Sequence, residues 1–174
     1  MEELVNAAVG GNDDAFVLLM EQNMQSMYKA AWVYLKNEED IADAIQDTIL
    51  ACYEKLNTLR HPEYFKTWLI RILLNKCNNI LKKGPVYTNL DVLEEKGAPD
   101  HAFERSEWQE LLGKLDEKYS IVFLMYYYEQ MPVKEIGKAL QISQNTVLTR
   151  LRRGKQKLRQ ELQLESSPVH ACHN

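Results

Sequence analysis

The stretch VKEIGKALQISQNTVLTRLRR, residues 133–153, decides the fold of the C-terminal part of the chain. Its spacing of apolar residues predicts a short helix over 133–140, followed by a tight turn at 141–142. Ser143 suits the N-cap of a second helix, because its hydroxyl can accept a hydrogen bond from an exposed backbone N–H. A helix, a tight turn and a second helix in this order are typical of a helix-turn-helix.

The second helix of this motif is predicted over 144–162. Val147, Leu151 and Leu158 recur at helical spacing and indicate the side that packs inward. The opposite side is polar and suits the major groove of DNA, where the first residues of such a helix read bases and later basic residues meet phosphates. This polar side contains Asn145, Thr149, Arg150, Arg152 and Arg153.

The rest of the chain is predicted to be helical on both sides of one irregular segment. Apolar periodicity predicts helices over 13–35, 38–57, 62–83, 102–115 and 117–129. The segment after residue 83 contains Gly, Pro and acidic residues with no sustained period, which indicates a linker. We therefore expect an all-α fold with two small helical domains joined by a flexible linker. The expected parts are a domain over 1–83, the linker over 84–104, a helix-turn-helix domain over 105–164 and a disordered tail over 165–174.

Composition supports a helical protein that remains in the cytoplasm. Five Pro and seven Gly among 174 residues leave room for long helices. No apolar run approaches the roughly 18–20 residues that span a bilayer, and the acidic start lacks the features of a signal peptide. Three Cys at wide spacing argue against a disulfide framework, so we expect Cys52 and Cys77 to be reduced core residues.

Charge alternates in blocks along the chain, although the formal net charge is −4. Residues 61–83 carry five basic residues and one acidic residue, and residues 132–160 carry eight and one. The segments around them are acidic. This pattern favours two anion-facing surfaces, whereas scattered solvated faces are the alternative.

The predicted helix over 38–57 has an acidic side opposite its apolar side. Solvated helix faces usually mix signs, but here only Lys55 dilutes the acids, which favours a surface for a basic partner. The apolar side contains Ile41, Ile45, Ile49, Cys52 and Leu56, and the acidic side contains Asp40, Asp43, Asp47 and Glu54.

The predicted helix over 62–83 has a continuous polar stripe whose groups suit phosphates and base edges. Phe65, Leu69, Ile72 and Ile80 are expected to face the core. Tyr64 and Trp68 are candidates for stacking on unpaired bases, although either could belong to the core. The stripe contains Thr67, Arg71, Asn75, Asn78 and Lys82.

Two longer segments together resemble the extracytoplasmic-function (ECF) group of bacterial sigma factors. DIADAIQDTILACYEKLNTLRHPEYFKTWLIRILLNKCNNILKK (40–83) is similar to the second conserved region of that family, with its F-x-T-W-L-x-R-I-x-x-N signature. LLGKLDEKYSIVFLMYYYEQMPVKEIGKALQISQNTVLTRLRRGKQKLRQEL (111–162) is similar to the fourth, with its E-I-[AG]-x-x-L-x-I-S-x-x-T-V core. The order and spacing of both segments across a linker make the resemblance specific.

The resemblance implies a role for each surface. The acidic side, with Gln46 added, would dock on the β′ clamp of core RNA polymerase, with the β subunit also a partner. The 62–83 helix, with Lys66 added and Asn75 at the family's Asn, would open the −10 promoter element and hold a flipped-out base. The 144–153 segment, with Thr146 and Leu148 added, would read the −35 element. The resemblance also implies an anti-sigma factor, which in this family is frequently a single-pass membrane protein.

The chain departs from the family pattern at four positions. Asp116 replaces a usual Pro, Gln141 replaces a common turn Gly, and Leu148 and Tyr126 stand where Lys or Arg is frequent. These departures affect the expected promoter sequence rather than the expected fold.

Two other functions were weighed. A helix-turn-helix regulator of duplex DNA would leave the acidic side and the polar stripe without a role. The sequence contains no Gly-rich phosphate loop and no nucleophile motif that would indicate an enzyme. The cluster His170, Cys172 and His173 lacks a fourth ligand, so we expect no metal site, no cofactor and no catalytic residue.

Overall fold

The computed structural model describes residues 1–83 and 107–165, and every regular element within them is helical. The described chain divides into two compact units, one formed by residues 1–83 and the other by most of 107–165. The predicted all-α class with two helical parts is therefore confirmed. The predicted linker over 84–104, and residues 166–174 of the predicted tail, lie outside the described residues.

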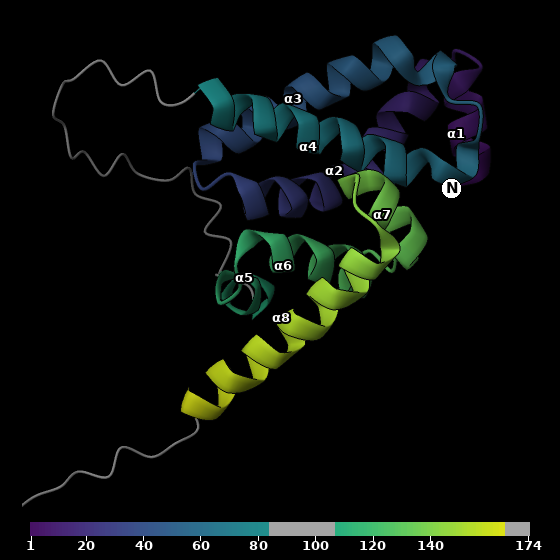
Figure 1. Cartoon of the computed structure of the whole chain (residues 1–174). Helices are drawn as coiled ribbons and strands as arrows, with labels where there is room; N and C mark the ends of the chain where they lie inside the picture. The colour runs from purple at the N-terminus through teal and green to yellow at the C-terminus, as the bar shows by residue number, and fades with distance from the viewer. Residues whose placement is uncertain (84–106, 166–174) are drawn as a thin grey trace, which may run out of the picture. The chain divides into compact units, whose positions relative to one another are not determined.

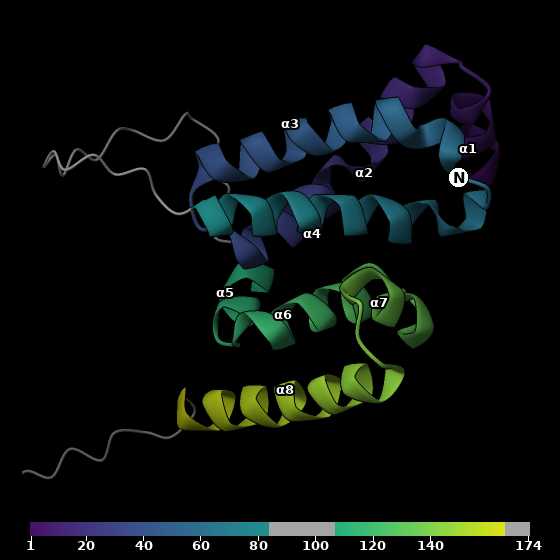
Figure 2. The same ribbon diagram turned by 45° about the horizontal axis from the view of Figure 1, so that its top comes forward.

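The first unit is a bundle in which three long helices pack side by side (Figures 1 and 2). Asn12 and Asn37 cap two of these helices. The side-chain oxygen of Asn12 accepts a hydrogen bond from the backbone N–H of Ala15, and that of Asn37 accepts from Glu39 and Asp40. A short helix that the sequence analysis did not predict packs against the first long helix. The elements are α1 (Glu2–Val9), α2 (Asp13–Tyr34), α3 (Glu38–Lys55) and α4 (Phe65–Lys83), with 3₁₀ turns at Leu56–Thr58 and Pro62–Tyr64.

The core of the first unit follows most of the predicted apolar pattern of α3. Ile41, Ile45, Cys52 and Leu56 are buried, as predicted, but Ile49 is half-exposed. Burial raises the pKa of the Cys52 thiol to about 12, so this side chain behaves as a neutral core residue.

The buried face of α4 is wider than predicted. Phe65 and Leu69 are buried as expected, whereas Ile72 and Ile80 are only half-buried. Ile72 lies just outside the buried face, because α4 packs against both α2 and α3 and buries the half of its circumference that begins at Phe65. Ile80 lies on the buried face but close to the end of the helix. The remaining fully buried positions of α4 are Ile70, Leu73, Leu74 and Cys77.

The second unit contains the predicted helix-turn-helix and two preceding helices. The predicted helix over 117–129 is present, with its last turn wound as a π-helix. The predicted helix over 102–115 is seen only from residue 107, because 102–106 lie outside the described residues. The elements are α5 (Glu107–Gly113), α6 (Glu117–Phe123), the π-helix Leu124–Tyr128, α7 (Val133–Leu140) and α8 (Gln144–Glu165).

Close packing of α8 against α6 explains a glycine inside a long helix. A Cβ atom at Gly154 would lie 2.6 Å from the Phe123 ring, so only glycine lets the two helices approach this closely. Val147 and Leu158 are buried on the same side of α8, while Leu151 is half-buried. The predicted inward side of α8 is therefore largely correct.

The turn between α7 and α8 has the expected N-cap, and one of its residues has an unfavourable backbone conformation. The Ser143 hydroxyl accepts a hydrogen bond from the backbone N–H of Thr146 at 3.1 Å, which confirms the predicted N-cap. Gln141 adopts the left-handed conformation, with φ of 56°, and its N–H donates to the Gly137 carbonyl. A glycine is favoured in this conformation, so the departure from the family pattern at position 141 has a conformational cost.

Candidate nucleic-acid and protein interfaces

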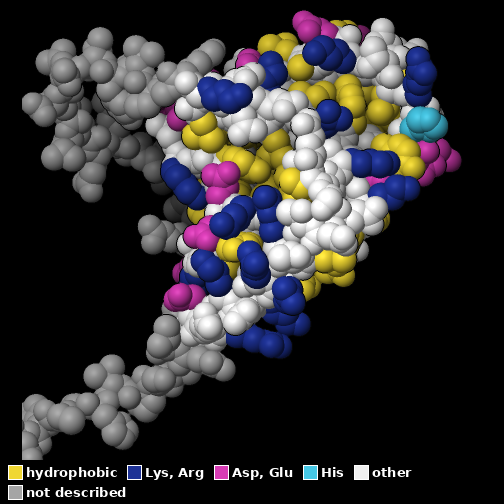
Figure 3. Space-filling view, in the orientation of Figure 1, with side chains coloured by type: hydrophobic (Ala, Val, Ile, Leu, Met, Phe, Trp, Pro, Cys, Tyr) yellow, Lys and Arg dark blue, Asp and Glu magenta, His cyan; other side chains and the backbone are white. Residues whose placement is uncertain are grey.

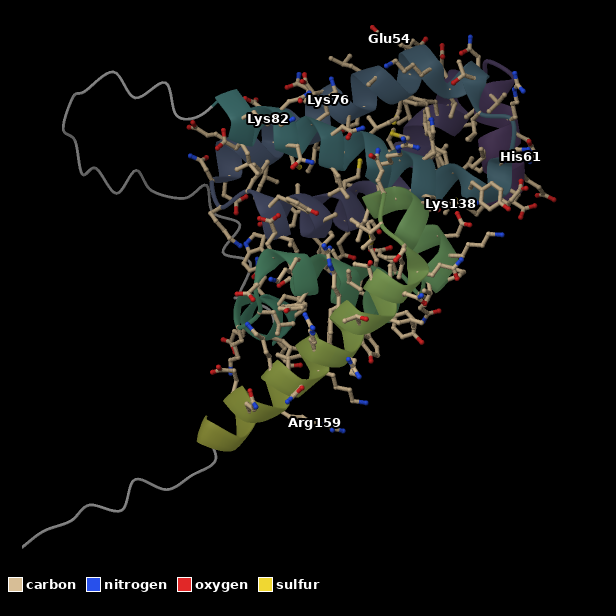
Figure 4. All side chains as sticks on the ribbon, in the orientation of Figure 1. Glu54, His61, Lys76, Lys82, Lys138 and Arg159 are labelled. Carbon is tan, nitrogen blue, oxygen red and sulfur yellow. The ribbon has the colours of Figure 1, made fainter. Side chains whose placement is uncertain are left out.

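The acidic side of α3 is exposed along most of its length. Asp43, Gln46, Asp47 and Glu54 are exposed, and Asp40 is half-buried in the first turn. The Lys76 ammonium of α4 lies 3.5 Å from the Asp47 carboxylate, an exposed ion pair that contributes little to stability. Figure 4 shows Glu54 projecting from α3 away from the neighbouring α4, and Lys76 and Lys82 extending from α4.

The exposed surface of α3 also carries two apolar side chains that were not predicted, Leu50 beside the acids and Tyr53 at the border with α2. Leu50 is 58% exposed and Tyr53 is 59% exposed. Tyr53 packs edge-on against Phe16, with ring centroids 5.2 Å apart, and its hydroxyl donates to Asp13 of α2 at 3.2 Å. The helical wheel carries the signal for Leu50, because this residue falls within about 20° of Asp43 on the side opposite the core. The α3 surface therefore combines negative charge with exposed apolar area.

The polar stripe of α4 lies opposite its buried face. Arg71, Asn75, Asn78 and Lys82 are exposed, and Thr67 is half-buried. These five residues follow one line along the helix because they step by three or four positions. Guanidinium, amide and ammonium groups thus lie in a row over more than three turns.

Lys66 does not belong to this stripe. It is half-buried, and at about 100° per residue it lies roughly 140° around the helix from Arg71. The structure therefore groups Lys66 with the inner side of α4 rather than with the Asn75 row.

Aromatic side chains cluster at the start of α4. Tyr64 is exposed and its ring centroid lies 5.9 Å from that of His61. Trp68 is half-buried, with its ring centroid 6.1 Å from that of the buried Phe65. Phe65 is a core residue, whereas Tyr64 is exposed and Trp68 is half-buried.

The polar side of α8 presents its predicted residues together. Asn145, Leu148, Arg152 and Arg153 are exposed, and Thr146, Thr149 and Arg150 are half-buried. Figure 3 shows Lys and Arg side chains gathered over this helix, and Figure 4 marks Arg159 near its end.

One basic residue of this surface comes from another helix. Lys118 and Tyr119 of α6 line an open depression of about 380 Å³ with five residues of α8. Lys118 was not among the predicted residues, because the contact that brings it beside α8 is tertiary. The α8 residues that line this depression are Asn145, Thr146, Thr149, Arg150 and Arg153.

An ion pair holds the start of α6 to α8. The Lys157 ammonium donates to the Asp116 carboxylate at 2.8 Å, and this hydrogen bond lowers the pKa of Asp116 and raises the pKa of Lys157. Asp116, which departs from the family's usual Pro, therefore has a structural partner. Tyr126, another departure, is exposed and lies edge-on to Tyr127, with ring centroids 5.0 Å apart.

Residues 1–83 and 107–165 contain no cluster of His, Cys, Asp and Glu suited to a metal ion. His170, Cys172 and His173 lie outside these ranges. Cys52 and Cys77 are buried free thiols, which confirms their prediction as reduced core residues. Within the part of the chain that the structure describes, no helix is long and apolar enough to cross a membrane.

Comparisons with known proteins match both units to one family. The family model for Sigma-70 region 2 matches residues 19–84, and the model for Sigma-70, region 4 matches residues 105–158. RNA polymerase sigma factor SigV of Bacillus subtilis is 29% identical over 153 residues, covering 86% of this chain and 92% of SigV. ECF RNA polymerase sigma factor SigW of the same organism is 28% identical over 170 residues, covering 87% and 91%.

Solved structures agree with these matches. CnrH, in complex with the cytosolic domain of CnrY, has a TM-score of 0.70 and 26% identity, covering 95% of this chain and 98% of CnrH. RpoE of Bartonella quintana, in complex with the anti-sigma factor NepR, shares the fold, with a TM-score of 0.66 and 14% identity, covering 86% and 97%. With regions 2 and 4 matched in order and relatives aligned over nearly their full length, the chain belongs to the sigma-70 family and is an ECF RNA polymerase sigma factor for transcription initiation.

Proposed function

We propose that the two units divide the work of promoter recognition between them. Sigma factors bind core RNA polymerase and promoter DNA and are not themselves enzymes, so the remaining question is which surface performs which task. The observation that carries the proposal is that each family region places one continuous polar helix face on its surface, on α4 and on α8. We assign a region 2 domain to residues 1–83, a linker to 84–104 and a region 4 domain to 105–164.

The exposed side of α3 is the proposed site for core RNA polymerase. Its acids suit a basic partner, and the β′ clamp of the polymerase is the partner that the family resemblance implies. Leu50 and Tyr53 support this role, because exposed apolar side chains among charges are typical of a protein interface with an apolar centre and a polar rim. Contacts with the β subunit would add to this docking.

The stripe of α4 is the proposed site for the −10 element. Arg71 and Lys82 can neutralise phosphates, while Asn75 and Asn78 can hydrogen-bond the edges of unpaired bases. Tyr64 and Trp68 offer accessible rings on which such bases can stack, which stabilises a separated strand. This arrangement suits DNA opening better than duplex binding.

The exposed side of α8 is the proposed reader of the −35 element. Its first turns would enter the major groove, and the basic residues that flank them would hold the phosphate backbone. Lys118 joins this set, because it shares a depression with Arg150 and Arg153.

We further propose that an anti-sigma factor restrains the protein. CnrH was solved with the cytosolic domain of CnrY, and this relative aligns with nearly the whole chain. A partner with a cytosolic domain supports a membrane-anchored inhibitor and a cytoplasmic location for this sigma factor.

A transcription assay tests the assignment of the two promoter elements. Purified protein is added to sigma-free bacterial core RNA polymerase with fragmented genomic DNA of the source organism, and run-off transcripts are sequenced. Discrete start sites preceded by a shared pair of motifs near −10 and −35 are the expected result. Transcripts that share only one motif, or none, would contradict the proposed division between α4 and α8.

Charge reversal tests the assignment of α3 to the polymerase. Asp43→Lys combined with Asp47→Lys is expected to weaken binding to core polymerase at least tenfold, because like charges would then face each other across the interface. The matched control is Glu2→Lys with Glu3→Lys, two exposed acids at the start of α1. Affinity for core polymerase, measured by fluorescence titration, should be unchanged in the control. Equal affinities for both double variants would show that the acidic side is only a solvated face.

A further inference from the structure

Leu148 is an exposed apolar side chain on a surface that is otherwise polar. It is 52% exposed, whereas Val147 and Leu158 of the same helix are buried. Its neighbours along the helix, three positions before and four positions after, are the exposed Asn145 and Arg152. Among the α8 side chains that the structure describes, Leu148 is the one large apolar group classed as exposed. The fold does not need this leucine for its core.

Around α8, Leu148 lies far from Arg150 and Arg153. At about 100° per residue, Leu148 lies roughly 160° from Arg150 and roughly 140° from Arg153. Those two arginines share their depression with Lys118, which suits contact with phosphates on that side of the helix. Leu148 lies instead within about 60° of Asn145 and Arg152, in the second turn from the N-terminus of α8. Side chains in this part of a recognition helix reach base edges.

The chemistry of the major groove restricts what Leu148 can select. Base edges there present hydrogen-bond donors and acceptors, with which a leucine cannot pair. The C5-methyl of thymine is the one apolar group among the standard bases in this groove, and it is recognised by apolar contact. A leucine placed against another base would leave that polar edge without a protein partner, which costs affinity.

We propose that Leu148 selects a thymine in the −35 element through contact with its C5-methyl group. This inference rests on the proposed role of α8 as the −35 reader, and it adds the chemical identity of one base. Family members with Lys or Arg at this position would favour guanine instead, because these side chains pair with guanine O6 and N7. The −35 elements of this protein should therefore share an A·T pair at the position that Leu148 faces.

Removing a single methyl group from the DNA tests the proposal. Promoter fragments from the transcription assay are prepared with each −35 thymidine, on either strand, replaced in turn by 2′-deoxyuridine. The affinity of the reconstituted holoenzyme for each fragment is measured by fluorescence titration. At one position, deoxyuridine is expected to weaken binding about three- to fivefold, the value of one buried methyl group. Leu148→Ala holoenzyme should bind the two fragments with equal affinity at that position.

Arg153→Ala provides the matched control. A lost phosphate contact should weaken binding to every fragment by the same factor and leave the ratio between thymidine and deoxyuridine unchanged. The inference is overturned if no deoxyuridine changes wild-type affinity, or if Leu148→Ala keeps the full sensitivity to the methyl group. Promoters that lack a −35 motif would overturn the proposed function of α8 itself, which is a separate result from loss of methyl sensitivity at a motif that exists.

Discussion

The helices α4 and α8 both present a polar face for DNA, but they differ in how much of the core they form. α4 buries six apolar side chains against two neighbouring helices, whereas α8 buries Val147, Gly154 and Leu158, mainly against α6. The helix assigned to DNA opening is thus held firmly by its bundle, which suits a surface that must keep unpaired bases in place. The helix assigned to sequence reading is attached along one seam, so its exposed residues can change without disturbing the fold. Leu148, which departs from the family pattern, occupies such an exposed position of α8.

Truncating a buried leucine should destabilise the protein more in α4 than in α8. Leu73→Ala in α4 should reduce the free energy of unfolding of its unit by about 2–5 kcal/mol, because Leu73 is fully buried between helices. Leu158→Ala in α8 should fall at the lower end of that range, because Leu158 keeps 8% exposure on a single seam. Urea unfolding of the full chain, followed by circular dichroism, measures both. Leu81→Ala, at an exposed position of α4, is the control and should have almost no effect. A larger loss of stability for Leu158→Ala than for Leu73→Ala would show that α8 is held at least as firmly as α4.

The next effect concerns the exposed face of α4. Arg71→Ala and Asn75→Ala should each slow promoter opening by roughly tenfold, which corresponds to about 1.4 kcal/mol of lost contact with a separated strand. Both side chains are exposed, so the fold and the affinity for core polymerase should not change. Permanganate footprinting of unpaired thymines measures opening, and fluorescence titration measures core binding.

Parallel variants of α8 serve as controls for α4. Arg153→Ala should reduce the affinity of the holoenzyme for closed promoter DNA while the subsequent opening rate stays the same. If Asn75→Ala weakened core binding as much as it slowed opening, the assignment of α4 to the −10 element would fail.

The sequence was sufficient to predict what depends on local periodicity. The helices of both units, the Ser143 cap and most of the exposed residues of α4 and α8 follow from spacing along one chain segment. The errors arose where a second element decides the outcome. Ile72 was placed in the core instead of Leu73 because two neighbours, rather than one, cover α4.

Tertiary contacts also explain the residues that were missed. α1 has only eight residues, too few for its periodicity to predict a helix that its packing on α2 stabilises. Lys118 joins the α8 surface only because α6 packs beside it, a relation that no spacing in the sequence records. The residues of a site on one helix can thus be predicted from their spacing, whereas a surface formed by two helices can be identified only from the three-dimensional structure.

The turn that attaches α8 should show a smaller change in stability than the cores of α4 and α8. Gln141 holds a left-handed conformation, which costs a residue with a Cβ atom roughly 1–2 kcal/mol. Glycine avoids this cost, but part of the gain is lost because glycine has more conformational freedom in the unfolded chain. Gln141→Gly should therefore stabilise the second unit by about 0.5–1 kcal/mol, since the hydrogen bond from its backbone N–H to Gly137 is retained. Hydrogen exchange of the α7 and α8 backbone amides in the full chain measures this local gain. Gln156→Gly, at an exposed position inside α8, is the control and should destabilise these amides by about 1 kcal/mol. If both glycine variants lowered the protection of these amides equally, the backbone at Gln141 would not be strained. The packing of α8 against α6 would then account for the stability of α8 without a contribution from the turn.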